Sequence, residues 1–333
     1  MLSTPSRLPR LAALLLAGGL LSGCAESLSA GPASSPGASG PAASPTPSCD
    51  PAPLAKRAAA VLVVGIPGVT TAEEPLGQSV VDLGVGGLFL SEPNVESAEQ
   101  VKALVDGLRA RAGRPLLVST DEESGRVAVT REIVGAGPSP RRMARQMTAA
   151  QVRELAAGIG KQLLEVGVDL DLAPLLDLDD GPYSGIIGDR SFSADPAIAT
   201  EYGLAFSAGL VDAGVTPTVK HFPGQGRSTT DTHAEAAVVD APLEDLRGTD
   251  LVPFQAAIDA GAPVVMLNHL GYAALDPDLP ASLTPKAYAL LREMGFEGVA
   301  MTDSLGMGAV NLRWDFPEAA VRAIEAGADS ALA

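Results

Sequence analysis

The sequence predicts an α/β fold of the (β/α)8 TIM barrel type, folded as a single catalytic domain. Eight short apolar runs with β-type composition alternate with amphipathic helical patterns, which is typical of parallel βα units. The 281 residues from Pro53 to Ala333 match the usual length of one such barrel. The predicted strands are 60–65, 86–90, 115–120, 168–174, 216–222, 263–269, 298–303 and 328–333.

Start and stop signals delimit the helices between these strands. Ser97 with Gln100, and Thr148 with Gln151, have the spacing of a capping box, which satisfies free amides at a helix start. Proline suits the first helical turn, and glycine suits a helix end that needs a left-handed residue. These positions are Pro196, Pro285, Pro317, Gly167, Gly214, Gly261, Gly295 and Gly327.

Between residues 149 and 166, apolar residues recur at spacings of three and four, and we expect this stripe to lie against the barrel. It consists of Val152, Leu155, Ala156, Ile159, Leu163 and Val166. The sequence given ends at the eighth strand, so we expect a barrel that lacks its last helix. Because uncovered first and last strands would expose apolar surface, either residues 54–60 or a missing C-terminal segment would have to shield them.

The first 23 residues are interpreted as a lipoprotein signal peptide. Arg7 and Arg10 precede an apolar run from Leu11 to Leu21, and small residues lie directly before Cys24. The run is short and interrupted by glycine, which disfavours a bilayer-spanning helix. An ordinary secretory signal and a membrane-spanning helix are the alternatives. We expect cleavage before Cys24 and lipidation of this residue, which would anchor an exported protein to the outer face of the cytoplasmic membrane.

Residues 24–53 are dominated by Ala, Ser, Pro and Gly and have almost no large apolar side chains. Such a segment cannot bury enough surface to offset its chain entropy, so we expect a flexible tether. Its Cys49 would have no partner for an intramolecular disulfide once Cys24 is acylated. The barrel, residues 54–333, is therefore expected to fold without disulfides.

Charge and composition exclude several classes of partner. The formal net charge is −17, and it falls to −19 without the leader and its two arginines. So acidic a protein is a poor candidate for binding nucleic acid or anionic lipid headgroups. No cofactor or metal is expected, because there are only three histidines, no CxxC pair and no glycine-rich loop with phosphate-binding spacing. We expect a monomer.

Polar residues follow several predicted strands at their carboxyl ends, where active sites of such barrels lie. Asp121 follows the third strand, Arg190 lies in the loop after the fourth, Lys220 and His221 end the fifth, and Asp303 ends the seventh. We expect these side chains to converge on one rim.

Two further residues, Asn268 and His269, end the sixth strand and are expected on the same rim. Of the three histidines, His269 is the weakest candidate for catalysis, and we expect it to be a hydrogen-bonded rim residue.

The segment KHFPGQGRSTTDTH at 220–233 contains two of the three histidines. Its second half has neither helical nor strand periodicity, which predicts a loop. Asp231 and His233 lie two residues apart there, and an aspartate that orients an imidazole makes histidine a proton donor and acceptor near neutral pH. A solvated loop histidine is the alternative.

The chain resembles the bacterial β-N-acetylglucosaminidases of glycoside hydrolase family 3. KHFPGQG followed by D-x-H is similar to that family's KHFPGHG and DSH, and DEESGRV at 121–127 to its DQEGGRV. IGDRSFSADP at 187–196 is similar to IGDRSFG-DP, MTDSLGMGA at 301–309 to the segment with the family's catalytic aspartate, and LDPDLPASLTP at 275–285 also fits. These motifs span residues 61–333.

The resemblance implies a retaining mechanism, which needs a nucleophile and an acid/base group on either side of the scissile bond. Asp303 would be the nucleophile, and His233 the acid/base, oriented by Asp231. The residues implied to bind the sugar are Asp121, Arg126, Arg190, Lys220 and His221.

Alternative roles exist for some of these residues. Asp303 could be a helix N-cap, and Arg126 could be the ion-pair partner of Glu122 or Glu123. Adjacent strand residues point to opposite faces, so Lys220 and His221 would both reach a ligand only if the chain bends at Phe222-Pro223-Gly224.

Three departures from the family pattern stand out. Ser124 replaces a glycine of DQEGGRV, Gln225 replaces the middle histidine of KHFPGHG, and Val129 lies where close relatives often have a second substrate-binding arginine. The last departure leaves recognition of the aglycone or of the outer hydroxyls open.

The expected function is the removal of terminal β-N-acetylglucosamine from cell-wall muropeptides. The alternatives are another activity of the same family, namely a β-glucosidase or a phosphorylase that uses phosphate in place of water, and a non-catalytic sugar-binding lipoprotein. Relatives in the family continue through an eighth helix, which is the reason to expect a missing C-terminus.

Overall fold

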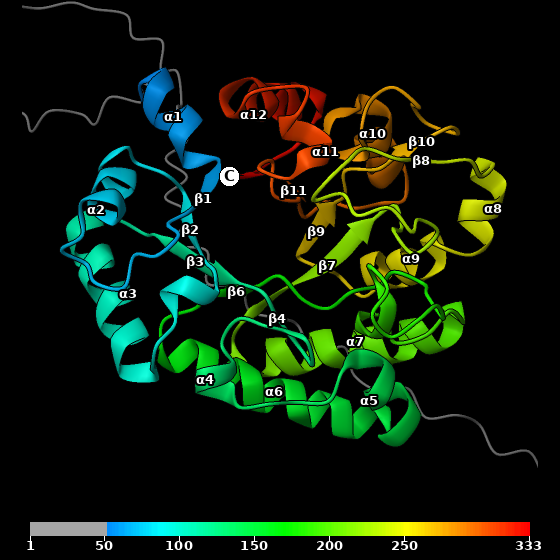
Figure 1. The fold of residues 1–333 in the computed structure, drawn as a ribbon, viewed down its shortest axis with the longest axis horizontal. Helices are drawn as coiled ribbons and strands as arrows, with labels where there is room; N and C mark the ends of the chain where they lie inside the picture. Colours follow the sequence, from blue (N-terminus) through cyan, green and yellow to red (C-terminus); the bar gives the residue numbers. More distant parts are fainter. Residues whose placement is uncertain (1–51) are drawn as a thin grey trace, which may run out of the picture. The chain divides into compact units, whose positions relative to one another are not determined.

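Eight parallel strands form the central sheet of the protein (Figure 1). This computed structural model describes residues 52–333, and its strands are neighbours in the order β11-β9-β7-β6-β3-β2-β1-β12. Every predicted strand is confirmed, each within its predicted range. The strands are β1 (Leu62–Gly65), β2 (Gly87–Leu90), β3 (Leu117–Thr120), β6 (Leu170–Asp171), β7 (Thr216–Phe222), β9 (Val264–Leu267), β11 (Val299–Thr302) and β12 (Ala331–Leu332).

The sheet is nearly closed into a barrel. β12 pairs with β1 in parallel, with Leu62 opposite Ala331. Between β11 and β12, the two ends of the strand order, the contact is a single parallel bridge from Met301 to Ser330. There the Thr302 amide donates to the Ser330 carbonyl at 3.1 Å. The predicted (β/α)8 barrel is therefore confirmed.

Helices surround this sheet (Figure 1). They are α1 (Leu54–Ala60), α2 (Pro75–Asp82), α3 (Ala98–Ala112), α4 (Arg131–Val134), α5 (Pro140–Gln146), α6 (Ala149–Glu165), α7 (Pro196–Ala213), α8 (Leu243–Gly248), α9 (Leu251–Asp259), α10 (Pro285–Glu293), α11 (Gly308–Asn311) and α12 (Phe316–Ala326). The 3-10 turns are η1 (Glu92–Asn94), η2 (Gly188–Arg190) and η3 (Ala281–Leu283). Two short ladders lie outside the barrel sheet: β4 (Glu122–Ser124) with β5 (Val127–Ala128), and β8 (Val238–Val239) with β10 (Gly271–Tyr272).

The predicted helix signals are largely confirmed. Thr148 and Gln151 form a complete capping box at the start of α6. At α3 only half of the predicted box exists, because the Ser97 hydroxyl accepts from the Gln100 amide at 3.2 Å while the Gln100 side chain bonds to the Glu96 amide instead. The predicted prolines lie in the first turns of α7, α10 and α12, and the predicted glycines all have positive φ.

Helix α6 buries the predicted apolar stripe, with Leu155 half-buried and the other members buried. It crosses α7 closely at Gly209, where an added Cβ would lie 2.3 Å from the Arg153 carbonyl oxygen. Only glycine allows this approach of the two backbones. The pair of helices thus covers one side of the barrel.

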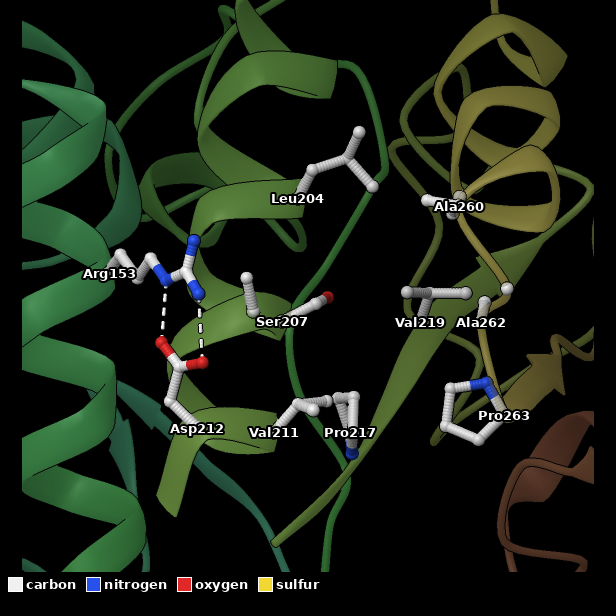
Figure 2. A pocket seen from close by; sticks show the side chains of 13 residues that line it. Arg153, Leu204, Ser207, Val211, Asp212, Pro217, Val219, Ala260, Ala262 and Pro263 are labelled. Atoms are coloured by element: carbon white, nitrogen blue, oxygen red, sulfur yellow. Dashed lines mark hydrogen bonds and ion pairs between the residues drawn. The ribbon is translucent and has the colours of Figure 1, made fainter. Parts of the chain in front are cut away.

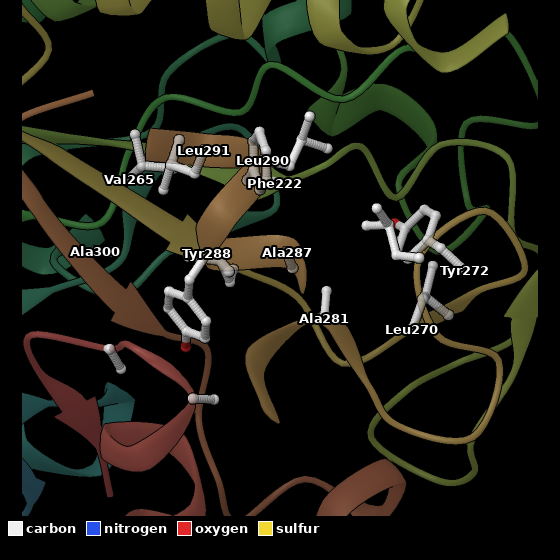
Figure 3. Packing of buried hydrophobic residues seen from close by; sticks show 14 of the residues in the cluster. Phe222, Val265, Leu270, Tyr272, Ala281, Ala287, Tyr288, Leu290, Leu291 and Ala300 are labelled. Atoms are coloured by element: carbon white, nitrogen blue, oxygen red, sulfur yellow. The ribbon is translucent and has the colours of Figure 1, made fainter. Parts of the chain in front are cut away.

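The hydrophobic core has layers inside and outside the barrel. One cluster consists of residues from the barrel strands and of Leu172, which directly follows β6: Val63, Leu170, Leu172, Val264, Met266, Met301 and Leu332. Outside the barrel, Tyr288 and Leu291 of α10 pack toward β7, β9 and β11 (Figure 3). Phe222 contacts Phe254 edge to face, with centroids 5.4 Å apart. These layers give the strand ends a rigid support.

The expectations for the chain ends have different outcomes. Helix α1 buries none of its residues, so the idea that residues 54–60 form an apolar shield for the first and last strands is wrong. The predicted signal peptide (1–23), Cys24 and the tether up to residue 51 lie outside the described residues. From residue 52 onward, no helix is both long enough and apolar enough to cross a membrane.

Candidate active site

A cavity of about 630 Å³ lies at the carboxyl ends of the barrel strands. Side chains from the ends of β3, β7 and β11 and from the loops that follow them line it. The predicted site residues that line this cavity are Asp121, Arg190, Lys220, His221, His233 and Asp303. The structure therefore brings together residues that are up to 182 positions apart in the sequence.

The floor of the cavity contains a buried network of two cations and two carboxylates. Nζ of Lys220 lies 2.5 Å from Asp121 Oδ1 and 2.7 Å from Glu123 Oε1. The guanidinium of Arg190 donates to both Glu123 oxygens, each at 2.7 Å. Such two-pronged, charge-assisted bonds fix the side chains before a ligand arrives.

Charge in this network follows from its pairing. Burial would raise the pKa of Glu123, but Arg190 and Lys220 outweigh it and lower that pKa to about 2. Burial would lower the pKa of Lys220, yet Asp121 and Glu123 raise it overall. The lysine therefore stays charged, and Asp121, which is partly exposed to the cavity, is available to sugar hydroxyls. Glu123 is not among the predicted site residues, although it lies in the DEESGRV motif.

A second partner that the sequence did not reveal is Asp177. Nδ1 of His221 lies 2.6 Å from Asp177 Oδ2, and both side chains are buried. Asp177 Oδ1 also accepts a hydrogen bond from the backbone N–H of Gln225 at 2.7 Å. The available signal was an aspartate just past the end of the predicted fourth strand.

Lys220 and His221 both line the cavity although they are adjacent on β7. The regular pairing of β7 with β9 is interrupted between Val219 and Phe222. The predicted irregularity therefore exists, but it lies earlier than the predicted bend at 222–224.

Asp303 follows β11 directly and is half-buried at the cavity. Its Oδ1 accepts from the Ser304 amide at 2.7 Å. Burial would raise the pKa of Asp303, but His221, His269, the Ser304 backbone N–H and Lys220 together outweigh burial, so the pKa is lowered. The N-cap alternative is wrong, because the next helix, α11, begins at Gly308 and has Met307 as its N-cap.

The predicted loop carries an Asp231–His233 pair. Asp231 Oδ1 lies 2.9 Å from both the backbone nitrogen and Nδ1 of His233, and the imidazole is 72% exposed. Because Nδ1 faces the carboxylate, Nε2 is left for a ligand or water. The hydrogen bond from the His233 backbone N–H is the main cause that lowers the pKa of Asp231, and the His233 side chain adds to it.

Backbone hydrogen bonds tie this loop to the segment after Asp303. The Gly308 amide donates to the His233 carbonyl at 2.9 Å, and the Ala309 amide donates to the Thr232 carbonyl at 3.0 Å. A Cβ at Gly308 would lie 2.6 Å from the His233 carbonyl oxygen, so glycine is needed there. These bonds hold His233 on the same cavity as Asp303.

Two of the departures from the family pattern also line the cavity. Gln225 is buried and its Nε2 donates to Thr232 Oγ1 at 3.3 Å, while its Oε1 has no protein partner. Val129 adds an apolar side chain to the wall. Gln225 thus connects the Asp177 pair to the histidine loop.

Four of the residues expected at the site do not line the cavity: Arg126, Asp231, Asn268 and His269. Arg126 donates to the carbonyls of Gly185 and Ile187 at 2.6 and 2.8 Å and pairs with Asp189 at 2.9 Å. The alternative ion pair with Glu122 or Glu123 is therefore wrong. Arg126 instead supports the loop that carries Arg190.

Asn268 and His269 are buried behind the rim. The Asn268 amide donates to the His221 carbonyl at 3.0 Å. His269 contacts Ser282 Oγ at 2.7 Å and the Ser304 carbonyl at 2.8 Å, and burial lowers its pKa. Its predicted hydrogen bonding is confirmed, whereas the expected convergence of Asn268 and His269 on the cavity is wrong.

Another hollow, of about 330 Å³, lies between α7 and α9 (Figure 2). Its walls are mostly apolar, and its charged residues Arg153 and Asp212 bond to each other at 2.6 and 2.8 Å. It offers no free acid or base, unlike the cavity at the strand ends, which is the candidate active site. Across residues 52–333 there is no group of three or more His, Cys, Asp or Glu side chains placed to hold a metal ion.

A cavity at the carboxyl face of a (β/α)8 barrel that presents a free carboxylate and an Asp–His pair indicates the class of glycoside hydrolases. Comparison with known families supports this class, because the glycosyl hydrolase family 3 N terminal domain matches residues 59–333. The chain belongs to this family and is a glycoside hydrolase, as its motifs indicated.

Individual relatives agree with this assignment. The β-hexosaminidase LpqI of Mycobacterium tuberculosis is 40% identical over 282 residues, which are 82% of this chain and 71% of that protein. The solved structure of M. tuberculosis LpqI superposes with a TM-score of 0.78, and the match covers 84% of this chain and 82% of the LpqI chain. A family 3 β-N-acetylglucosaminidase from Paenibacillus sp. has a TM-score of 0.79 and 33% sequence identity, and the match covers 84% of this chain and 54% of the Paenibacillus chain.

Proposed function

We propose that the protein is an exported β-N-acetylglucosaminidase that removes terminal β-linked N-acetylglucosamine from cell-wall muropeptide fragments with retention of configuration. The observation that carries this proposal is the placement of Asp303 and of His233, whose Nδ1 contacts Asp231, on one cavity. The names of the relatives, β-hexosaminidase and β-N-acetylglucosaminidase, support the choice of an amino sugar.

In the first step, a carboxylate oxygen of Asp303 attacks the anomeric carbon of the sugar. The glycosidic bond breaks, and protonated His233 gives its proton from Nε2 to the departing oxygen. Its lowered pKa keeps Asp303 ionised and ready to attack. Asp231 stabilises the imidazolium and holds Nδ1, so that Nε2 is the nitrogen that exchanges the proton.

In the second step, neutral His233 takes a proton from water, and the resulting hydroxide equivalent attacks the anomeric carbon. The bond to Asp303 breaks and the free sugar leaves. Two inversions at the anomeric carbon give net retention.

Asp121, Arg190, Lys220 and His221 are proposed to bind the sugar. All four line the cavity, and their partners fix them before the substrate arrives. The proposed contribution of Arg126 is indirect, because its guanidinium is committed to the loop at 185–189.

The function is tested by turnover of an aryl β-N-acetylglucosaminide against the matching aryl β-glucoside. We expect the amino sugar to be the far better substrate and the product to form first as the β-anomer. A protein that hydrolyses the glucoside equally well would be a β-glucosidase, and one that binds saccharides with no turnover would be a sugar-binding lipoprotein.

A phosphorylase is the second candidate, because the proposed acid/base on the cavity, His233, is a histidine rather than a carboxylate. A neutral imidazole does not repel an incoming phosphate as a carboxylate would. Product formation in phosphate and in a non-nucleophilic buffer separates the two reactions. We expect free sugar in both buffers, and a sugar phosphate as main product would identify a phosphorylase.

The proposed location is the outer face of the cytoplasmic membrane, through a lipid on Cys24. The sequence before Cys24 supports this proposal. Replacing Cys24 by Ala is expected to move the full chain out of the membrane fraction or leave it unprocessed. A Cys24→Ala protein that is still processed and lipid-labelled would refute the anchor.

A further inference from the structure

The loop that carries His233 has a single buried residue. Between residues 226 and 238, only Thr232 is buried, and it directly precedes His233. Thr232 is 1% exposed, whereas the His233 imidazole is 72% exposed. An exposed segment with few packed side chains is only weakly held in place, so the position of His233 depends on the contacts that fix Thr232.

Two contacts from different strand ends hold Thr232. The Ala309 amide, from the segment after β11, donates to the Thr232 carbonyl at 3.0 Å. Gln225, from the segment after β7, donates from Nε2 to Thr232 Oγ1 at 3.3 Å. Among residues 52–333, this is the only side-chain hydrogen bond that joins the stretch 228–236 to the rest of the protein. Thr232 is therefore tied to the ends of both β7 and β11.

The backbone around Gln225 is firmly held. Its N–H donates to Asp177 Oδ1 at 2.7 Å, and the same carboxylate contacts His221. A Cβ at Gly226 would lie 1.8 Å from the Leu178 carbonyl oxygen, so the chain passes directly against this residue. The side chain of Gln225 thus extends toward Thr232 from a rigid support.

The amide group of Gln225 makes no other contact with the protein. Gln225 is 4% exposed, and its Oε1 has no partner among the described residues. Burying an amide with incomplete hydrogen bonding costs free energy, whereas a methionine of similar length would fill the space without this cost. The amide therefore adds little to the stability of the fold, and what it adds is the contact with Thr232.

We propose that Gln225 is a positioning residue for the acid/base histidine. It acts through Thr232 and keeps the His233 imidazole at the cavity beside Asp303. This inference rests on the proposed function, because that function gives His233 the acid/base role. It goes further in assigning a role in proton transfer to a neutral amide that does not touch the substrate.

Two single substitutions remove the contact from either side. Gln225→Met replaces the amide by an apolar group, and Thr232→Val replaces the hydroxyl by a methyl group. Both should lower kcat/KM for a natural disaccharide about fivefold, as expected for one neutral hydrogen bond. A dinitrophenyl glycoside, which needs little protonation, should be hardly affected. The inhibition constant of free N-acetylglucosamine should not change, because the contacts proposed to bind the sugar remain.

The double variant Gln225→Met/Thr232→Val shows whether the two side chains act through each other. We expect the same fivefold loss as in each single variant, because one contact can be removed only once. Losses that multiply to about 25-fold would show independent effects and overturn the link. An equal loss for both leaving groups would overturn the positioning role.

The matched control is Gln255→Met on α9. The Gln255 Nε2 donates to Asp259 Oδ1 at 2.9 Å and to the Met294 carbonyl at 3.1 Å, and none of these residues lines the cavity. This control removes another glutamine amide and should leave kcat/KM unchanged for both substrates. If it showed the same dependence on the leaving group, the pattern would reflect general destabilisation, and the proposal would be wrong.

Hydrogen exchange followed by mass spectrometry tests the contact without any hydrolysis. In the full-length protein, peptides from residues 227–238 should exchange severalfold faster in Gln225→Met and in Thr232→Val, but not in Gln255→Met. Unchanged exchange in the first two variants would overturn the inference. Absence of turnover in the unmodified protein would contradict the proposed function, while the exchange rates would still decide whether Gln225 holds the loop.

Discussion

Nδ1 of His221 lies 2.6 Å from Oδ2 of Asp177, with both side chains buried beneath the substrate cavity. The protein therefore has two histidine–aspartate pairs in opposite environments, because the His233 imidazole of the other pair is largely exposed. A buried pair is fixed and suits sugar binding, whereas an exposed one can exchange protons with water.

Replacing Asp177 by Asn should weaken substrate binding. The two oxygens of the Asp177 carboxylate contact Nδ1 of His221 and the backbone N–H of Gln225. Asn has only one oxygen, so one of these two contacts is lost. Loss of a hydrogen bond to a buried charge costs about 1.5–3 kcal/mol, and we expect KM to rise about tenfold or more. Steady-state kinetics measure this, with exposed Asp240→Asn as the control. If the variant is destabilised but its KM is normal, the pair only supports the fold.

Asp303 should carry the glycosyl group during turnover. Asp303→Ala should lower kcat by several orders of magnitude, since covalent catalysis then fails. Two other carboxylates of the cavity are already paired, Asp121 with Lys220 and Glu123 with Lys220 and Arg190. A slow substrate with an electron-withdrawing group on the ring should leave an adduct on Asp303, and peptide mapping that finds it on Asp121 or Glu123 would reverse the assignment.

Removing the His233 imidazole should hurt most when the leaving group is poor. His233→Ala should greatly slow hydrolysis of a natural disaccharide but hardly slow formation of the glycosyl-enzyme from a dinitrophenyl glycoside, which needs little protonation. Asp231→Ala should show a weaker version, because the imidazole remains but is poorly oriented. The measurement is kcat/KM across leaving groups of graded pKa. An equal loss for every leaving group would mean that His233 is not the acid/base.

Stability should depend on pH through Glu122. Burial raises the pKa of Glu122 from 4.5 to about 7 despite its bonds to Thr130 and Ser124. The folded protein therefore binds this proton more tightly than the unfolded chain does. The resulting contribution to the free energy of unfolding is complete below pH 4.5 and is lost as the pH rises toward 7. The full effect is on the order of 3 kcal/mol.

Glu122→Gln should therefore flatten the profile of unfolding free energy between pH 4.5 and 7. Urea denaturation at several pH values measures it, with exposed Glu132→Gln as the control. An unchanged slope in Glu122→Gln would show that other groups set the pH dependence.

Ser124 has a φ of 65°, the single non-glycine residue with positive φ among residues 52–333. This conformation costs about 1–2 kcal/mol without glycine, while the Ser124 hydroxyl gains a bond to the Pro138 carbonyl at 2.9 Å. Ser124→Gly removes both the strain and the bond, so we expect little net change. Ser124→Ala keeps the strain and loses the bond, and should be less stable than the glycine variant by about 1 kcal/mol. The measurement is the thermal unfolding midpoint of the Ser124→Gly and Ser124→Ala variants. Equal midpoints would contradict backbone strain at residue 124.

The order of strands and much of the site could be predicted from the sequence. Strand positions depend on local apolar runs, and in a parallel barrel every strand presents its carboxyl end to the same face. Asp121, Lys220 and Asp303 therefore had to meet at one cavity. The loop with Asp231 and His233 could also be predicted, because both partners lie within three residues.

Only the tertiary structure decided which side chains pair across that face. Asp177 contacts His221 from 44 positions away, and Glu123 contacts Arg190 from 67. No local pattern records such a contact, since it depends on the closure of the barrel and on where each loop turns. Arg126 shows the same limit: its motif implied a sugar ligand, but the fold directs it to carbonyls about 60 residues away. Short-range periodicity determined the elements, and long-range packing determined the partners.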